Sequence, residues 1–238
     1  MNQTLLLLPG LMCDAAVWAP QVEALVSVVN CVVVGYGQCD SITRMAEQAL
    51  EQTPTETFAM AGHSMGGRVA LEVMRLAPQR VERLALLDTG THALAAGEPG
   101  AKERAGRMAL LALARSQGMR AMGRQWAHGM VHPSQLDGAL FESVLDMLER
   151  SSCEQFAAQI NALLKRPDAG PLLGEIACPT LLLCGREDNW SPPAQHQTMC
   201  DQMRHAWLCI VEQCGHMSTL EQAAVVNKAL ADWLVRPN

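Results

Sequence analysis

The sequence has few aromatic residues and no excess of positive charge. Its 238 residues include only 5 Trp, 1 Tyr and 3 Phe, and 18 Lys and Arg stand against 24 Asp and Glu, for a net charge of −6. Proteins that bind nucleic acids present basic surfaces and aromatic stacking platforms. We therefore expect no nucleic-acid partner.

Long apolar runs are also missing. No run approaches the ~18 residues of a membrane-spanning helix. The apolar stretch Leu5–Leu8 lacks the basic flank of a signal peptide, because the first positive residue is Arg44. These absences predict a cytoplasmic protein with no membrane partner.

Motifs for metals and cofactors are absent as well. The nine cysteines contain no Cys-x-x-Cys pair and no Cys/His spacing typical of zinc, and no Gly-x-Gly-x-x-Gly follows the first apolar run. Cysteines within apolar runs are typical of reduced, buried thiols. We expect no metal site and no cofactor.

What the chain does contain is a regular alternation of strand and helix patterns. A hydrophobic fraction of 49% with 18% charged residues excludes a disordered chain. Six short apolar runs that do not alternate with polar residues predict parallel strands covered on both faces. They are Thr4–Leu8, Cys31–Val34, Thr57–Ala61, Arg83–Leu87, Thr180–Cys184 and Ala206–Val211. The fold class is therefore α/β, with a mostly parallel sheet of about six strands and flanking helices.

The stretch between the fourth and fifth strands is too long for one crossover. Asp88 and Thr180 are 92 positions apart, whereas a strand-helix-strand unit needs ~30 residues. Helical periodicity predicts four extra helices there: Lys102–Ser116, Met119–Val131, Ser134–Arg150 and Ser152–Lys165. We expect an α/β core of residues 1–90 and 171–238, with a helical cap, or lid, of residues 91–170 inserted in it.

Helix boundaries can be expected at a few positions. Met65–Leu76 is predicted as a helix that Pro78 stops, and Thr219–Leu234 as the closing helix. Ser152-x-x-Gln155 and Ser218-x-x-Glu221 both have the pattern of a capping box.

The strongest chemical signal is Gly62-His63-Ser64-Met65-Gly66. It follows a predicted buried strand and precedes a predicted helix, which is the setting of a nucleophile turn of the Gly-x-Ser-x-Gly type. The two glycines are needed where the turn is too tight for a side chain, and Ser64 is lifted above the sheet. We expect Ser64 to be a nucleophile.

A serine hydroxyl becomes a strong nucleophile only when a base accepts its proton and a carboxylate orients that base. His216 and Asp188 each follow a predicted strand, and the chain order Ser64, Asp188, His216 lets all three meet at one edge of a parallel sheet. Asp88 also ends a strand and is the competing choice for the acid, although its segment precedes the insertion.

An acyl-transfer site also needs N–H donors for the developing oxyanion. We expect the backbone N–H of Met65, next to the nucleophile, and that of Leu11, which follows the turn at Gly10, to form this oxyanion hole.

Together these motifs make the chain resemble the α/β-hydrolase superfamily, and within it the small cofactor-free esterases, lactonases and carbon–carbon hydrolases with a helical cap. The resemblance rests on the Pro9-Gly10 turn, the Ser64 motif, Cys178-Pro-Thr-Leu-Leu-Leu-Cys-Gly-Arg-Glu-Asp188 and Cys214-Gly-His216. Two departures stand out. Pro9-Gly10 replaces the usual His-Gly, and the shortened Gly35–Ser41 turn lacks an arginine that often braces the oxyanion loop in such proteins.

The resemblance implies a serine hydrolase that cleaves a small or medium apolar carboxylic ester or lactone through an acyl-enzyme on Ser64. Apolar pocket walls are expected from Met12, Met122, Trp126, Trp190 and Met217. The physiological partner would be a small-molecule substrate, and the protein a monomer or homodimer.

Other reactions stay open with the same triad. One is thioester hydrolysis. Another is carbon–carbon bond hydrolysis, or an elimination, on an anionic dioxo substrate, for which a basic lid pocket would be needed. Its candidates are Arg104, Arg107, Arg115, Arg120 and Arg124. A ligand receptor without turnover is disfavoured by the complete triad.

Overall fold

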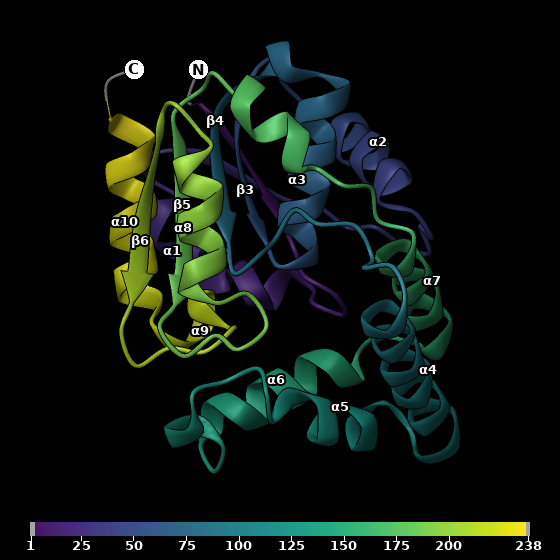
Figure 1. Ribbon diagram of the computed structural model, residues 1–238. Coiled ribbons are helices and arrows are strands. Elements are labelled where there is room, and N and C mark those ends of the chain that lie inside the picture. Colours follow the sequence, from purple (N-terminus) through teal and green to yellow (C-terminus); the bar gives the residue numbers. More distant parts are fainter. Residues whose placement is uncertain (1–2, 237–238) are drawn as a thin grey trace.

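The computed structural model describes residues 3–236 and contains a six-stranded parallel sheet (Figure 1). Its order is β2-β1-β3-β4-β5-β6, and every neighbouring pair is parallel. The strands are β1 (Thr4–Leu8), β2 (Asn30–Val33), β3 (Phe58–His63), β4 (Val81–Leu87), β5 (Thr180–Gly185) and β6 (Ala206–Val211). All six predicted strands are confirmed, with ends that move by at most two residues.

Helices cover both faces of this sheet. Since crossovers between parallel strands are right-handed, the reversal of direction after β2 puts α1 (Ala19–Leu25) on one face and α2 (Ile42–Gln52) on the other. The helix α10 (Ala223–Val235) packs against α1, while α3 (Met65–Leu76) packs against α2. The helix α8 (Pro193–Asp201) lies over β5 and β6 on the α3 side (Figure 1). The predicted helix Met65–Leu76 is confirmed.

Four helices lie between β4 and β5, where the sequence predicts four. They are α4 (Glu98–Gln117), α5 (Met119–Ala127), α6 (Ala139–Glu149) and α7 (Cys153–Leu164). The third begins later than predicted, because a short 3₁₀ turn at Pro133–Gln135 precedes it. Figure 1 shows α4 to α7 grouped beyond the carboxyl edge of the sheet.

The closing segment differs from the prediction. Instead of one helix from Thr219, a short α9 (Ser218–Glu221) is separated from α10 by Gln222, whose φ of −130° and ψ of 49° are not helical. The predicted capping box at Ser218 is wrong, because its hydroxyl donates to the Asp88 carboxylate. Glu221 instead accepts hydrogen bonds from the backbone N–H groups of His132, Met217 and Gly215.

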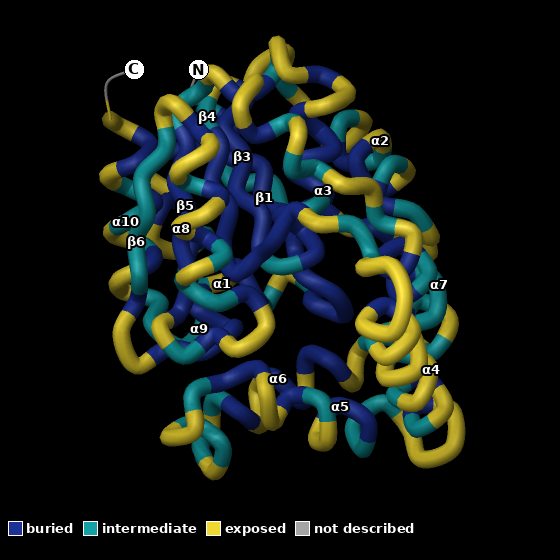
Figure 2. Tube along the Cα trace, viewed as in Figure 1, coloured by how far each residue is buried: buried dark blue, intermediate teal, exposed yellow. Residues whose placement is uncertain are grey.

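The core is built on the central strands. All residues of β1, β3 and β5 are buried, whereas the edge strand β6 is mostly half-buried (Figure 2). The loops that follow β1, β3, β4, β5 and β6 all leave the sheet at the carboxyl ends of the strands, which we call the carboxyl edge. The chain reverses its winding direction between β1 and β3. Ligands of open α/β sheets bind at the carboxyl edge beside such a reversal. Within residues 3–236, none of the helices combines the length and apolar character needed to cross a membrane.

Candidate active site

Ser64 occupies a strained turn between β3 and α3. Its φ of 55° and ψ of −116° are rare for a residue with a side chain. The turn is crowded on both sides of the serine: a Cβ at Gly62 would lie 2.4 Å from the Gly66 carbonyl oxygen, and a Cβ at Gly66 would lie 2.0 Å from the Leu8 carbonyl oxygen. The two glycines of the motif are therefore required by backbone contacts.

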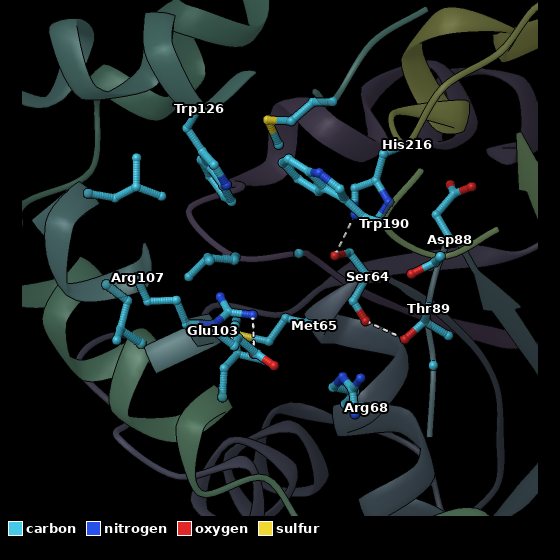
Figure 3. Close-up of a pocket in the computed structure, with 18 of the residues that line it drawn as sticks. Ser64, Met65, Arg68, Asp88, Thr89, Glu103, Arg107, Trp126, Trp190 and His216 are labelled. Atoms are coloured by element: carbon cyan, nitrogen blue, oxygen red, sulfur yellow. Dashed lines mark hydrogen bonds and ion pairs between the residues drawn. The ribbon is translucent and has the colours of Figure 1, made fainter. Parts of the chain in front are cut away.

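A chain of two hydrogen bonds joins the three predicted polar residues, and Figure 3 shows its first step, from Ser64 to His216. The Ser64 Oγ lies 2.8 Å from His216 Nε2, and His216 Nδ1 lies 2.8 Å from Asp188 Oδ2. The other oxygen of Asp188 accepts from the backbone N–H groups of Trp190 and Ser191, at 2.8 and 2.9 Å. The structure thus brings Ser64, His216 and Asp188 together, in the geometry in which a histidine can accept the serine proton.

Asp88, the competing acid, lies close by but contacts a different set of groups. It is fully buried at the end of β4, accepts from the backbone N–H of Gly185 at 3.1 Å, and is bonded to the Ser218 hydroxyl. Burial, together with the nearby charge of Asp188, raises the pKa of Asp88 well above its usual value. His216 is oriented by Asp188 and not by Asp88.

The electrostatics suit proton transfer at His216. Burial raises the pKa of Asp188, but the charge and hydrogen bond of His216 and two backbone N–H donors outweigh it, so its net pKa is lowered. Burial lowers the pKa of His216, but the charge and hydrogen bond of Asp188 raise it by more than burial lowers it. The net pKa of His216 therefore lies above 6.5. Asp188 therefore stays ionised and stabilises a protonated His216.

His63, directly before Ser64, lies beside the reacting groups, with its ring centroid 5.4 Å from that of His216, but it bonds to the His216 backbone and not to the Ser64 hydroxyl. Its Nε2 donates to the His216 carbonyl oxygen at 2.8 Å, and its Nδ1 is buried without a partner. Burial, and the proximity of His216, lower the pKa of His63 to about 4, so this ring is neutral at pH 7. It supports the His216 backbone.

The two predicted oxyanion donors face the same space as Ser64. Leu11 and Met65 both line the cavity at the site. Within residues 3–236 the Leu11 N–H donates to no protein acceptor, and the Met65 N–H is the first of α3, where the helix itself offers no partner. Both donors are available to a ligand.

The cavity has a volume of about 560 Å³ and an apolar side and a charged side. Trp126 and Trp190 stack on its apolar side with ring centroids 5.4 Å apart, and Trp190 lies 4.9 Å from the His216 ring. The other three predicted wall residues do not line it. Met12, Met122 and Met217 are at most 1% exposed, because their side chains face the core.

The charged side was largely missed by the sequence analysis. Arg68, Lys102 and Arg107 line the cavity, together with Glu103. Figure 3 shows Glu103 and Arg107 across the cavity from His216. Of the five arginines considered, only Arg107 reaches it. The rest, Arg104, Arg115, Arg120 and Arg124, lie elsewhere, and Arg120 is bonded to Glu142, Asp146 and Glu149.

Arg68 is the most unusual of these cations. Its Nη1 donates to the His92 carbonyl oxygen at 2.8 Å, but within residues 3–236 it forms no ion pair. Burial, followed by the nearby charge of Arg166, lowers the pKa of Arg68 to about 9. Its place in the sequence could have found it, because Arg68 lies among the first four residues of the helix that begins directly after Ser64.

Metal ligands are not gathered at this site. Within the described part of the chain, no group of three or more His, Cys, Asp or Glu side chains is arranged to hold a metal ion.

Known proteins share both the sequence pattern and the fold. A 2-hydroxy-6-oxononadienedioate/2-hydroxy-6-oxononatrienedioate hydrolase of Klebsiella pneumoniae is 28% identical over 255 residues, which cover 99% of this chain and 88% of that protein. A thermophilic esterase from Thermogutta terrifontis has a TM-score of 0.87 at 23% identity, with 98% of this chain and 90% of the other covered. The enol-lactonase from Burkholderia xenovorans LB400 has a TM-score of 0.84 at 22% identity, with 99% and 92% covered.

The family match extends over nearly the whole chain. A sequence model of the alpha/beta hydrolase family matches residues 5–229, which include Ser64, Asp188 and His216. The fold agrees, since a parallel sheet with helices on both faces also relates the chain to the esterase and the lactonase. This protein belongs to the alpha/beta hydrolase family.

Proposed function

We propose that this protein is a serine hydrolase that cleaves a carboxylic ester, lactone or thioester through an acyl-enzyme on Ser64. The observation that carries the proposal is the hydrogen-bonded chain from Ser64 Oγ through His216 to Asp188, with 2.8 Å in each step. Such a chain activates a hydroxyl for attack on an acyl carbon.

In the proposed reaction, the Ser64 oxygen attacks the substrate carbonyl carbon while His216 Nε2 accepts the hydroxyl proton. The carbonyl oxygen becomes an oxyanion, held by the Leu11 and Met65 N–H groups. The tetrahedral intermediate collapses by breaking the bond from the carbonyl carbon to the leaving oxygen or sulfur. The leaving alkoxide or thiolate, which stays attached to the acyl group in an opened lactone, takes the proton from His216 and becomes an alcohol or thiol. Water, deprotonated by His216, then releases the acid and regenerates Ser64.

We propose further that residues 91–170 form a lid over this site, inserted in a core of residues 1–90 and 171–238. Support comes from the cavity lining, which includes Leu110 of α4, Trp126 of α5 and Phe156 of α7. A substrate in the cavity would contact both the sheet edge and these helices, which would exclude water from the reacting carbonyl.

The test is hydrolysis of p-nitrophenyl butyrate by Ser64→Ala. We expect kcat/KM to fall by at least ~10³-fold, because the nucleophile is gone while the fold remains. Ser116→Ala, an exposed serine of α4, is the matched control and should retain wild-type activity. A Ser64→Ala protein that hydrolyses the ester as fast as its parent would refute the proposal. Labelling by a fluorophosphonate should follow the same pattern.

A second candidate function has its own support in the cationic side of the cavity. Three cations, Arg68, Lys102 and Arg107, outnumber the two acids that line the cavity, Glu103 and Asp88. Glu103 is already bonded to Arg107 and Arg166. Such a surface favours a substrate that carries a carboxylate. Carbon–carbon bond hydrolysis or an elimination on an anionic dioxo substrate fits it, and the Klebsiella relative's name contains a dioate.

Substrate charge separates the two candidates. If the natural substrate is anionic, a dioxo acid should be turned over with a kcat/KM at least ~10-fold above that of a neutral ester. Arg68→Gln should then raise KM for the acid and leave KM for the ester unchanged. Arg75→Gln is the matched control, since Arg75 lies two turns further along α3 and pairs with Glu72 outside the cavity. Preference for the neutral ester with no effect of Arg68→Gln would leave the esterase as the function.

A further inference from the structure

We infer that Gln159 is a positioning residue that holds the oxyanion loop, defined as Pro9–Cys13, in its working conformation. The inference rests on the proposed function, because it assigns a purpose to Leu11 in that reaction. It concerns a side chain of α7, which lies 147 residues away from the loop in the chain.

The loop contains an unfavourable turn. The Cys13 N–H donates to the Gly10 carbonyl oxygen at 3.1 Å, and Met12, the third residue of this four-residue turn, has a φ of 63°. These are features of a type II turn, which normally places glycine or asparagine at that position. A methionine there is disfavoured relative to the type I turn, here called the ordinary turn, in which φ of this residue is negative. Some other contact must select the observed form.

Gln159 supplies that contact. Its Oε1 accepts a hydrogen bond from the Met12 N–H at 2.8 Å, and the side chain is 1% exposed. In the ordinary turn the peptide between Leu11 and Met12 would be rotated by about half a turn, so that the Leu11 carbonyl oxygen would approach Oε1. Two acceptors cannot bond, and burial denies them water, so the Gln159 amide in its present orientation favours the observed peptide and would have to turn over to serve the other one.

The position of α7 makes this contact relevant to the reaction. Leu11 is the second residue of the same turn, and its N–H belongs to the peptide just before the one that would rotate. Gln159 therefore acts on this N–H indirectly: its bond to Met12 ties the turn to α7, and without that bond the loop is free to shift relative to Ser64. Even a small shift of the Leu11 N–H matters, because oxyanion donors act only within a narrow range of distance and direction.

The rest of α7 is held against the core and the cavity. The Asn161 amide donates to the Asp40 carbonyl oxygen at 3.1 Å, in the shortened Gly35–Ser41 turn. Phe156, Ile160 and Leu163 of the same helix line the cavity. The helix α7 therefore lines the cavity and also holds the oxyanion loop. It does so beside the Gly35–Ser41 turn, which lacks the arginine that often braces this loop in similar proteins.

The experiment compares Gln159→Met with Gln159→Glu in the wild-type chain, using p-nitrophenyl butyrate. Methionine keeps the length of the side chain but has no acceptor, so kcat should fall by ~10–100-fold while KM stays within ~3-fold. Glutamate keeps an oxygen at the same place and should retain most of kcat. Leu164→Ala, on the same helix but outside the cavity, is the control for loss of packing and should keep kcat.

Two results would overturn the inference: an unchanged kcat in Gln159→Met, or an equal loss in Leu164→Ala at a matched melting temperature. A crystal structure of Gln159→Met provides a readout besides activity, because Met12 should leave its positive φ. Retention of that φ would also overturn the inference. Failure of the proposed function is seen separately, as esterase activity that survives Ser64→Ala, and the crystal structure would then still decide whether Gln159 sets the turn.

Discussion

Backbone strain in this molecule is concentrated where strands end at the candidate site. Within residues 3–236, the non-glycine residues with a positive φ are Met12, Ser64, Asp88 and Gln213. They follow β1, β3, β4 and β6 respectively, all at the carboxyl edge of the sheet. Each such residue costs of order 1–3 kcal/mol, and the buried contacts around it must supply that free energy. Strained residues cluster at active sites in other proteins, so their position at the carboxyl edge supports a candidate active site there.

Single residues also set the pH at which the proposed reaction runs. Because His216 must be neutral to accept the Ser64 proton, kcat/KM should rise with pH through the pKa of His216, which lies above 6.5. In Asp188→Asn, burial remains while the opposing charge is lost, so the inflection should move below 6.5, and kcat should fall by ~10⁴-fold. The pH dependence of kcat/KM for wild type and variant measures both effects. An inflection that does not move would contradict the assignment of Asp188.

At the scale of an element, one sequence pattern leads to two different structures. Ser152-x-x-Gln155 begins α7 as predicted, with the Ser152 hydroxyl accepting from the Gln155 N–H at 3.1 Å. Ser218-x-x-Glu221 has the same spacing, but Ser218 bonds to the buried Asp88 and Glu221 to three backbone N–H groups. Local preference decides the first case because Ser152 has no long-range partner among residues 3–236. In the second case tertiary partners replace the cap.

The cap of α7 gives a stability prediction. Ser152→Ala should lower the free energy of unfolding by ~1 kcal/mol, because one N–H of the first turn loses its acceptor. Ser143→Ala on α6 is the comparison, since that exposed hydroxyl bonds only within its own helix, to Leu140, and should change stability by less than ~0.5 kcal/mol. Urea unfolding measures both. Equal effects of the two substitutions would mean that Ser152 does not act as a cap.

At the scale of the whole molecule, the site is a space between two layers that are distant in sequence. The sheet edge provides Ser64, His216 and the proposed oxyanion donors Leu11 and Met65. The four helices between β4 and β5 provide Lys102, Glu103, Arg107 and Trp126. Buried backbone bonds join the layers, such as the His216 N–H to the Met130 carbonyl oxygen at 2.7 Å. Parts of the helical segment are therefore fastened directly to the loop that holds His216.

Acid should weaken this assembly, in part through His63. Its pKa is about 4 in the folded protein and 6.5 when exposed, so the unfolded chain binds the proton more readily. His63 therefore contributes stability above pH 6.5 that is lost as pH falls toward 4, ~2 kcal/mol of it between pH 7 and 5. The difference in unfolding free energy between wild type and His63→Gln should shrink by this amount when measured by urea unfolding at the two pH values. A constant difference would contradict a neutral buried ring.

The sequence by itself determined the six strands and the three residues that meet at their carboxyl ends, whereas the order of the strands in the sheet is known from the structure. Apolar runs and the Ser64 motif are local signals that can be found in the sequence. The motif is local because the turn around Ser64 is too tight for a side chain at Gly62 or Gly66. Parallel strands then bring the loops after β3, β5 and β6 to one place. The inserted helical segment then fastens one of these loops, through the bond from the His216 N–H to the Met130 carbonyl oxygen.

Only the tertiary structure decided what surrounds them. Met12, Met122 and Met217 face the core, while Arg68 and Lys102 line the cavity. Gln159 reaches the oxyanion loop across 147 residues. Which face of a helix meets the cavity depends on how four helices pack on one another and on the sheet edge. That packing is the sum of many weak long-range contacts, and it leaves no short pattern in the sequence.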